Sequence, residues 1–360
     1  MNTTLAAQLQ AAAERLLPLH PRLTTLGERT LAIAEAAVEG FVLYHYLGEQ
    51  RAYLGRQNIN WLSKTSVGEG QSSFFAYSTP FILPLAQAYQ VTRDERYAEA
   101  ARDYFTEFMT AWPLAGVGQN PNADSTLCLS GRNANWAHSL HLLAASPAFD
   151  EALLARIIAF ITGQFAFLVP NIKSVINWRV FEARSLLNGC LFLPFIGPAN
   201  DWRQHAVRIL NDAWYRQFLP DGVHYERNPI YHGGMAGTFR DLLRVGRLLP
   251  ELGLVMTVDR LLPMYDFSLA CTKPSGYLCG IHDSQSEFTG HLRDGRHTAG
   301  HKGVNKTQEW EDFRREFDLP LTRPATSQVY PNAGRAFLRT AWDEDAAWLS
   351  FDASTWGSGH

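Results

Sequence analysis

The chain has 360 residues, of which 46% are hydrophobic and 19% are charged, and its formal net charge is -3. This length is sufficient for a large hydrophobic core together with a second domain. The near-neutral charge argues against a nucleic-acid-binding protein, because no broad basic surface is implied, but it does not exclude an acidic substrate bound in a locally basic cleft.

The cysteines, the hydropathy and the N-terminus restrict the class of protein further. Four cysteines, at positions 128, 190, 271 and 279, lack both metal-binding spacing and the density of a disulfide framework, so we expect free, buried thiols. No apolar run approaches the ~20 residues that cross a bilayer, so we expect no membrane association. Glu14 and Arg15 lie within the Ala/Leu helical pattern of residues 1–18, which argues against a secretory signal. The expected location is cytoplasmic, or periplasmic or secreted if a leader has been removed.

The first 270 residues are typical of a mainly helical protein, and strand-like alternation is nearly absent from them. Apolar side chains recur at helical spacing, as in residues 94–112, where Tyr97, Tyr104 and Phe108 fall on one stripe. Asp150 is suited to be a helix N-cap. The predicted helices are Leu26–Leu47, Tyr77–Tyr89, Asp94–Trp112, Trp136–Ala145, Asp150–Leu168, Arg179–Leu193, Trp202–Phe218, Met235–Leu249 and Leu252–Ala270. This number of antiparallel pairs predicts a bundle, a solenoid or a closed toroid, and the absence of a fixed-period repeat disfavours the solenoid.

The sequence pattern changes after Ala270. Residues 271–325 are rich in Gly and His, which is typical of a linker, with one short helical patch near Glu309–Phe317. From Ser327 onward the pattern predicts strands, at Arg335–Thr340 and Ala346–Asp352. Two strands do not make an independently stable sheet. We therefore expect a helical domain over 1–270, a linker over 271–325 and the beginning of an apparently truncated sheet domain over 326–360.

Residues 219–232, with the sequence LPDGVHYERNPIYH, are the most informative stretch of the chain. A tight turn at residues 220–222 precedes a dense group of titratable and hydrogen-bonding side chains. These are His224, Tyr225, Glu226, Arg227, Asn228, Tyr231 and His232. Burying such groups is costly unless each has a partner. The segment therefore predicts either a catalytic or binding site, or a polar turn that ties two helices together.

Three segments occur in a fixed order along the chain: Ile176–Arg179 (INWR), residues 221–232, and residues 330–360, which contain YPNAGRAFLR, LSFDA and a final GH. In this order they resemble the heparinase II/III-like polysaccharide lyases, a group that includes related alginate lyases. The resemblance runs from about residue 60 to the end. It implies a mainly α fold, in which an incomplete α/α toroid of antiparallel helix pairs is followed by the start of an antiparallel β-sheet (β-sandwich) domain.

The resemblance also implies a reaction, the β-elimination of uronic-acid-containing polysaccharides or oligosaccharides. The proton at C5 of the sugar is weakly acidic, and its removal creates an enolate-like dianion. The enzyme must neutralise the carboxylate, supply a base at C5 and supply an acid to the leaving oxygen at C4. The product is an unsaturated uronate.

Three residues match catalytic positions of the family. Asn177 matches the Asn that neutralises the carboxylate, since its amide can donate to a carboxylate oxygen, although the residues alone also fit an N-cap of the next helix. Tyr231 matches the catalytic Tyr, and a phenol acting as base needs cationic neighbours, for which His224, Arg227 and His232 are candidates. The alternative for Tyr231 is a buried structural role. His360 matches a cleft-lining His that acts as base or neutraliser.

Further residues are expected to bind substrate. They are His224, Glu226, Arg227, His232, Trp178 and Trp136. Glu226 and Arg227 also fit a role in fixing the turn, and Trp136 also fits a helix start together with Arg132 and Asn133. The Gly280–Ser284 segment matches a family loop, but His282 intervenes before Asp283.

The expected partner is an acidic polysaccharide or oligosaccharide, with no nucleic acid and no membrane, and the oligomeric state is not predicted. No metal site is assigned within the chain, because His291, His297 and His301 lie in a Gly-rich segment without a Cys partner. A structural divalent metal, zinc or calcium, would belong to the part of the β domain that follows His360 in relatives.

Three alternative functions remain open at this point. A uronate C5-epimerase shares the first proton abstraction. An α/α-toroid glycoside hydrolase needs two carboxyl groups flanking the bond, for which Asp221, Glu226 and Asp283 are available. A non-catalytic glycan-binding protein could use the same cleft.

Overall fold

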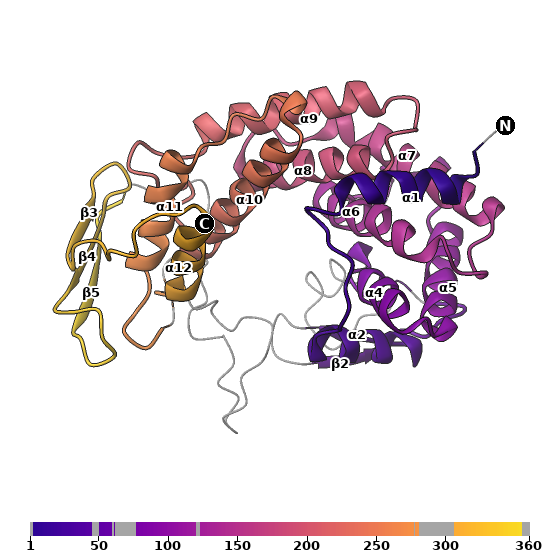
Figure 1. Ribbon diagram of the computed structural model, residues 1–360, viewed down its shortest axis with the longest axis horizontal. Helices are drawn as coiled ribbons and strands as arrows, with labels where there is room; N and C mark the ends of the chain where they lie inside the picture. The colour runs from indigo at the N-terminus through magenta and orange to yellow at the C-terminus, as the bar shows by residue number, and fades with distance from the viewer. Residues whose placement is uncertain are drawn as a thin grey trace. The chain divides into compact units, whose positions relative to one another are not determined.

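The protein is described by a computed structural model that covers residues 3–44, 50–59, 61, 77–119, 123–276, 278–280 and 306–354 (Figure 1). The chain divides into two compact units. Unit 1 comprises Met1–Tyr44, Glu49–Ser174 and Phe181–Arg208, and unit 2 comprises His45–Gly48, Val175–Val180 and Ile209–His360.

Unit 1 is built mainly of helices, with one hairpin. Its elements are α1 (Leu5–Leu16), α2 (Glu28–Val38), β1 (Phe41–Tyr44), β2 (Gln50–Tyr53), α4 (Ile82–Thr92), α5 (Glu95–Ala111), η1 (Leu114–Gly116), α6 (Thr126–Leu143) and α7 (Glu151–Asn171). The residues of α8 (Ile176–Phe192) and α9 (Ala199–Arg216) are shared between the two units. Asp150 caps α7 as predicted, because its side chain accepts from the Leu153 N–H at 2.8 Å.

The hairpin β1–β2 corrects the prediction of one helix over Leu26–Leu47. Helix α2 ends at Val38, and Gly40 follows with φ +84°, a left-handed conformation that a side chain disfavours. A Cβ on Gly40 would also lie 3.2 Å from the Gly55 Cα. Phe41–Tyr44 then pairs antiparallel with Gln50–Tyr53. Aromatic and β-branched residues directly after a left-handed glycine favour a strand over continued helix.

Helix α7 corrects the expectation that no apolar run is long enough to cross a membrane. It has 21 residues, and an 18-residue window within it has a mean hydropathy of 2.0, so by length and composition it meets the requirement for a span. Its side chains at Leu154, Ile157, Ile161 and Phe165 are nevertheless buried within the protein. Core helices of folded domains meet the same requirement, so the helix is weak evidence for a membrane.

Unit 2 combines helices with a small antiparallel sheet. Its own elements are α10 (Pro229–Leu248), η2 (Pro250–Leu252), α11 (Val258–Ala270), α12 (Lys306–Glu316), β3 (Gln328–Tyr330), β4 (Arg335–Arg339) and β5 (Trp348–Asp352). The strand order is β3-β4-β5, with Tyr330 opposite Arg335 and Phe337 opposite Ser350. Phe267 of α11 packs edge-on against the rings of Tyr330 and Phe337, so the sheet and the helix share one core.

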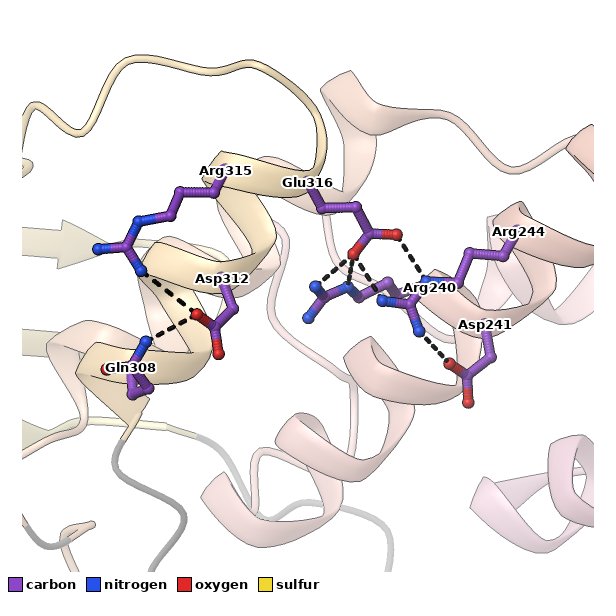
Figure 2. Close-up of polar contacts among 7 residues, drawn as sticks. All are labelled: Arg240, Asp241, Arg244, Gln308, Asp312, Arg315 and Glu316. Atoms are coloured by element: carbon purple, nitrogen blue, oxygen red, sulfur yellow. Dashed lines mark hydrogen bonds and ion pairs between the residues drawn. The ribbon is translucent and has the colours of Figure 1, made fainter. Parts of the chain in front are cut away.

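Helix α12 confirms the short helical patch that we predicted near Glu309–Phe317 within the linker, and polar contacts fasten it to α10 (Figure 2). The Glu316 carboxylate accepts from Arg240 Nε at 2.6 Å and from Arg244 Nε at 2.5 Å. On α12 itself, Asp312 Oδ1 accepts from Gln308 at 2.7 Å. Although burial opposes the shift, the hydrogen bonds from Arg244 and Arg240 hold the pKa of Glu316 below its usual value.

Candidate active site

The turn before α10 is a tightly closed loop within unit 2. The Leu219 N–H donates to the Val223 carbonyl at 2.8 Å, and the Gly222 N–H donates to the Leu219 carbonyl at 2.9 Å. Gly222 has φ +82°, and a Cβ there would lie 2.8 Å from Pro263 Cβ. Only glycine fits this position without strain, which explains the Asp-Gly pair in the sequence.

The two histidines of the turn are buried and bonded to the protein. The His224 N–H donates to His232 Nδ1 at 3.0 Å, so the proton of the His232 ring resides on Nε2, which faces the Met264 carbonyl at 2.8 Å. His224 Nε2 lies 3.2 Å from Gln217 Oε1. Burial lowers the pKa of His224 to about 3 and that of His232 to about 4. Both rings are therefore neutral at neutral pH, which corrects the expectation that they are cationic neighbours of Tyr231.

Asn177 lies in the first turn of α8, after a residue with a strained backbone. Ile176 has φ +64°, a left-handed conformation that is rare for a β-branched side chain. Its N–H donates to the Tyr225 hydroxyl, and its carbonyl accepts from Gln217 Nε2 at 2.8 Å. The Asn177 N–H donates to Glu226 Oε1 at 2.7 Å. These hydrogen bonds hold the backbone of residues 176–177 in its strained conformation. Strained residues at functional sites persist where the surrounding structure fixes them in this way.

Tyr231 lies in the first turn of α10, because that helix begins at Pro229 and not near Met235 as predicted. The cause is the capping group: Asn228 Oδ1 accepts from the Ile230 N–H at 2.9 Å and from the Tyr231 N–H at 3.1 Å. Proline at the first helical position is also favourable, since its missing N–H would have no partner there. Tyr231 is half-buried.

The structure thus joins the segments of Asn177 and Tyr231 within unit 2. Glu226 contacts the main chain of Asn177 and stands five residues before Tyr231 in the sequence. Tyr225 and Gln217 add contacts to Ile176. The amide and the phenol are therefore both carried on first turns of helices whose ends are tied by hydrogen bonds.

Arg227 and Arg335 bring positive charge to the same turn. Arg227 has φ +58° and is half-buried, and its carbonyl accepts from Arg335 Nη2 at 3.3 Å. Arg335 is buried, and its Nη2 also lies 3.1 Å from the Asp352 carboxylate. The two guanidinium groups thus lie at the turn whose histidines are neutral.

Several predicted substrate contacts are corrected by burial. Trp136 is wrong as a sugar-binding residue, because it has no exposed surface and its Nε1 donates to Thr79 Oγ1 at 2.9 Å inside unit 1. It lies in the middle of α6, which begins ten residues earlier at Thr126, so it does not mark a helix start. His224, Glu226 and His232 are at most 1% exposed, and they support the turn without facing a substrate.

For the other predicted site residues, the roles in catalysis or substrate binding stay predictions. Trp178 and Arg227 are half-buried, and Asn177 is 7% exposed. His360, His282 and Asp283 lie outside the described residues. The same holds for His291, His297 and His301, and the part of the chain that the structure describes contains no group of three or more His, Cys, Asp or Glu residues suited to a metal ion.

Gln217 is a site residue that the sequence did not indicate. It is 4% exposed, and it bridges the Ile176 carbonyl, the His224 ring and, through its own carbonyl, the Tyr225 N–H at 2.9 Å. In the sequence it appears as the polar end of an amphipathic helix, so no local signal distinguishes it.

Comparison with known proteins places these features in a family. Residues 6–297 match the family model described as "Heparinase II/III N-terminus". The chain is 26% identical over 178 residues to a heparin-sulfate lyase of Pedobacter heparinus, covering 49% of this chain and 27% of that protein. It is 21% identical over 241 residues to a heparin-sulfate lyase of Bacteroides stercoris, covering 62% and 36%.

Solved structures show the same fold. A crystal structure of heparinase III matches with a TM-score of 0.77 and 18% identity, covering 96% of this chain and 57% of that one. A heparan sulfate lyase from Pedobacter heparinus matches with a TM-score of 0.65 and 20% identity, covering 96% and 56%. The expected fold class, a helical toroid followed by an antiparallel sheet, is confirmed by this likeness. The chain spans little more than half of these solved chains.

Proposed function

The chain belongs to the heparinase II/III family, and from this premise we propose that it acts as a polysaccharide lyase, cleaving a uronic-acid-containing polysaccharide or oligosaccharide by β-elimination. The observation that carries the proposal is the hydrogen-bonded connection between the two helix starts. The Asn177 N–H meets Glu226 at 2.7 Å, and Glu226 leads directly into the first turn that bears Tyr231.

In the proposed reaction each group has one task. The Asn177 amide donates to the uronate carboxylate, which favours the dianionic state formed when C5 loses its proton. The Tyr231 oxygen accepts the C5 proton and returns it to the oxygen that leaves C4. The C5–H and C4–O bonds break, the C4=C5 double bond forms, and no other reactant is consumed.

Tyr231 needs a positive charge nearby if it is to carry the proton. A phenol with an ordinary pKa of ~10 needs positive charge nearby to act as a base at neutral pH. The two buried histidines are neutral, so the proposal assigns this role to Arg227, which lies four residues before Tyr231. The neutral rings then serve as rigid hydrogen-bonding supports for the turn.

The names of the relatives bear on the substrate class. The matched proteins of Pedobacter and Bacteroides are heparin-sulfate lyases. We therefore propose a glycosaminoglycan of that type, ahead of alginate, as the first substrate to test.

The proposal is tested with heparan sulfate, heparin, hyaluronan and alginate, and with oligosaccharides of each, by following the ultraviolet absorbance of the unsaturated uronate. Tyr231→Phe removes only the phenolic oxygen and should abolish product formation while substrate binding survives. The matched control is Tyr215→Phe, because Tyr215 belongs to the same unit and is 59% exposed. Full activity in Tyr231→Phe, or no unsaturated product from any polymer or oligomer, would refute the assignment.

The same assay separates the nearest alternative. A C5-epimerase would form no absorbing product but would exchange the C5 hydrogen with deuterated solvent. Exchange without absorbance would therefore replace the lyase with an epimerase, whereas absorbance excludes a purely epimerising enzyme.

A further inference from the structure

Two of the four cysteines meet at the end of α11, in unit 2. The helix ends at Ala270, and the chain turns through residues 273–276, where the Gly276 N–H donates to the Lys273 carbonyl at 2.9 Å. It then returns antiparallel, so that Thr272 pairs with Leu278. The Cys279 N–H donates to the Cys271 carbonyl at 2.9 Å. The turn thus brings together Cys271 and Cys279, which are eight residues apart in the sequence.

The geometry of this pair suits a disulfide. Residues that face each other in a hydrogen-bonded antiparallel pair have Cα atoms about 5.5 Å apart, within the range of about 4.4–6.8 Å that disulfides span. The two thiols also hydrogen-bond to each other. Both are free in this structure. The backbone pairing therefore places the two cysteines opposite each other.

The surroundings make the two thiols unequal. Cys271 has no exposed surface, and burial together with its hydrogen bond to Cys279 raises its pKa well above the usual value. The hydrogen bond from Cys271 and the charge of Arg335 lower the pKa of Cys279, although burial opposes them. Cys271 is therefore the protonated donor, and Cys279 is the better thiolate.

Arg335 acts on both thiols, because its charge lowers the pKa of Cys271 as well as that of Cys279. Its side chain is 1% exposed and its Nη2 lies 3.1 Å from the Asp352 carboxylate, while Nε and Nη1 have no hydrogen-bond partner among the residues that the structure describes. A buried guanidinium with unsatisfied donors favours a negative charge beside it. A thiolate at Cys279 supplies such a charge.

We propose that Cys271 and Cys279 form a redox-active dithiol, which closes to an intramolecular disulfide by exchange with a small aliphatic disulfide. The Cys279 thiolate attacks one sulfur of the reagent and releases one small thiolate, leaving a mixed disulfide. Cys271 loses its proton and attacks the Cys279 sulfur, releasing the second small thiolate. Two protein thiols are oxidised, the reagent disulfide is reduced to two thiols, and one Cys271–Cys279 bond is formed.

The disulfide should also change the stability of the core that adjoins the Gly222 turn. The pair belongs to the apolar core that contains Val223, which directly follows the Gly222 turn, and Phe267, which packs on the His232 ring. A covalent link across residues 271–279 reduces the freedom of the unfolded chain in this region. Oxidation should therefore raise the unfolding temperature of the protein.

The test uses the full chain, reduced and then incubated with glutathione disulfide without denaturant. After an acid quench and alkylation, peptide mass analysis should find Cys271 linked to Cys279 with the loss of two hydrogen atoms. Cys128 and Cys190 should stay reduced and be recovered as alkylated thiols. Like Cys271 and Cys279 they are buried, and burial raises the pKa of both thiols. The unfolding temperature should rise on oxidation in the wild type and in Cys190→Ala, but not in Cys279→Ala.

The peptide map of the wild type decides the question even if Cys279→Ala does not fold. Free thiols at both positions, a glutathione adduct on either without closure, or a bond that forms only in denaturant would each overturn the proposal. None of these results depends on lyase activity.

Discussion

The main-chain N–H of Asn177 and the carboxylate of Glu226, which are 49 residues apart in the sequence, meet at 2.7 Å in a buried part of unit 2. This bond, and the left-handed Ile176 beside it, determine how the start of α8 is presented to the turn that carries Tyr231. Replacing Glu226 is therefore the most direct test of this hydrogen bond.

Replacement of Glu226 should affect both stability and activity. Glu226→Ala leaves the buried Asn177 N–H without its acceptor, which should cost about 1–3 kcal/mol in the free energy of unfolding. If the proposed function holds, kcat should fall by up to ~100-fold through misplacement of the Asn177 amide. Glu226→Gln retains an oxygen acceptor and should recover much of both losses.

Urea unfolding and steady-state kinetics measure these two effects. The control is Glu344→Ala, because Glu344 is an exposed residue of the same unit and its loss should change neither quantity. Equal stability of Glu226→Ala and the wild type would contradict the framework role of this carboxylate.

A pair of glycine substitutions tests the Gly222 turn. Gly222→Ala places a Cβ 2.8 Å from Pro263 Cβ at φ +82°, and it should destabilise the protein by about 1–3 kcal/mol. Gly234→Ala is the matched control in α10, because no atom of the described residues lies within 4 Å of its Cβ position. That change should be neutral or stabilising by about 0.5–1 kcal/mol. Thermal unfolding of both variants checks the prediction, and a Gly222→Ala protein as stable as the control would contradict it.

The buried histidines predict a stability that falls in mild acid. Burial lowers the pKa of His232 to about 4 and of His224 to about 3 from the ordinary 6.5, so the unfolded chain binds more protons between these values. Their contribution is complete above about pH 6.5 and is lost as the pH falls toward 4, with a slope of up to about 1.4 kcal/mol per pH unit for each group. His138 and His141 of unit 1 act with the same sign.

Urea unfolding at intervals from pH 7 to pH 4.5 measures this slope. A His232→Asn variant, which cannot gain the proton, should show a shallower dependence than the wild type. A free energy of unfolding that is constant over this interval would show that these rings are accessible to protons in the folded state.

The Glu316 contacts in Figure 2 predict a modest role in attaching α12. Glu316→Gln should destabilise the protein by about 1 kcal/mol, a small value because Arg244 is 44% exposed and solvent screens the pair. Since the pKa of Glu316 is lowered, its contribution is present above its ordinary pKa and is lost as the pH falls through the folded value. Asp312→Asn on the same helix is the control, because Asp312 is 52% exposed. A larger loss in the control than in Glu316→Gln would contradict this assignment.

The sequence predicted the helices well where they show a clear periodicity, and less well at their starts. Asp150 caps α7 as expected, but α6 and α10 begin earlier than their apolar stripes indicate. Asn228 and Pro229 are a recognisable N-cap and first helical residue, so the start of α10 could have been read locally. The β1–β2 hairpin was missed because Phe41–Tyr44 continues the apolar character of α2.

What the sequence determined by itself is local: the period of the helices, the glycine turn at residue 222 and the three motifs that identify the family. What only the tertiary structure decided is burial and pairing at long range. It placed Trp136 in a core, made His224 and His232 neutral, and brought Glu226 to Asn177 and Cys271 to Cys279. The physical reason is that desolvation and hydrogen bonding depend on which atoms surround a group, and those atoms come from segments that no local pattern connects.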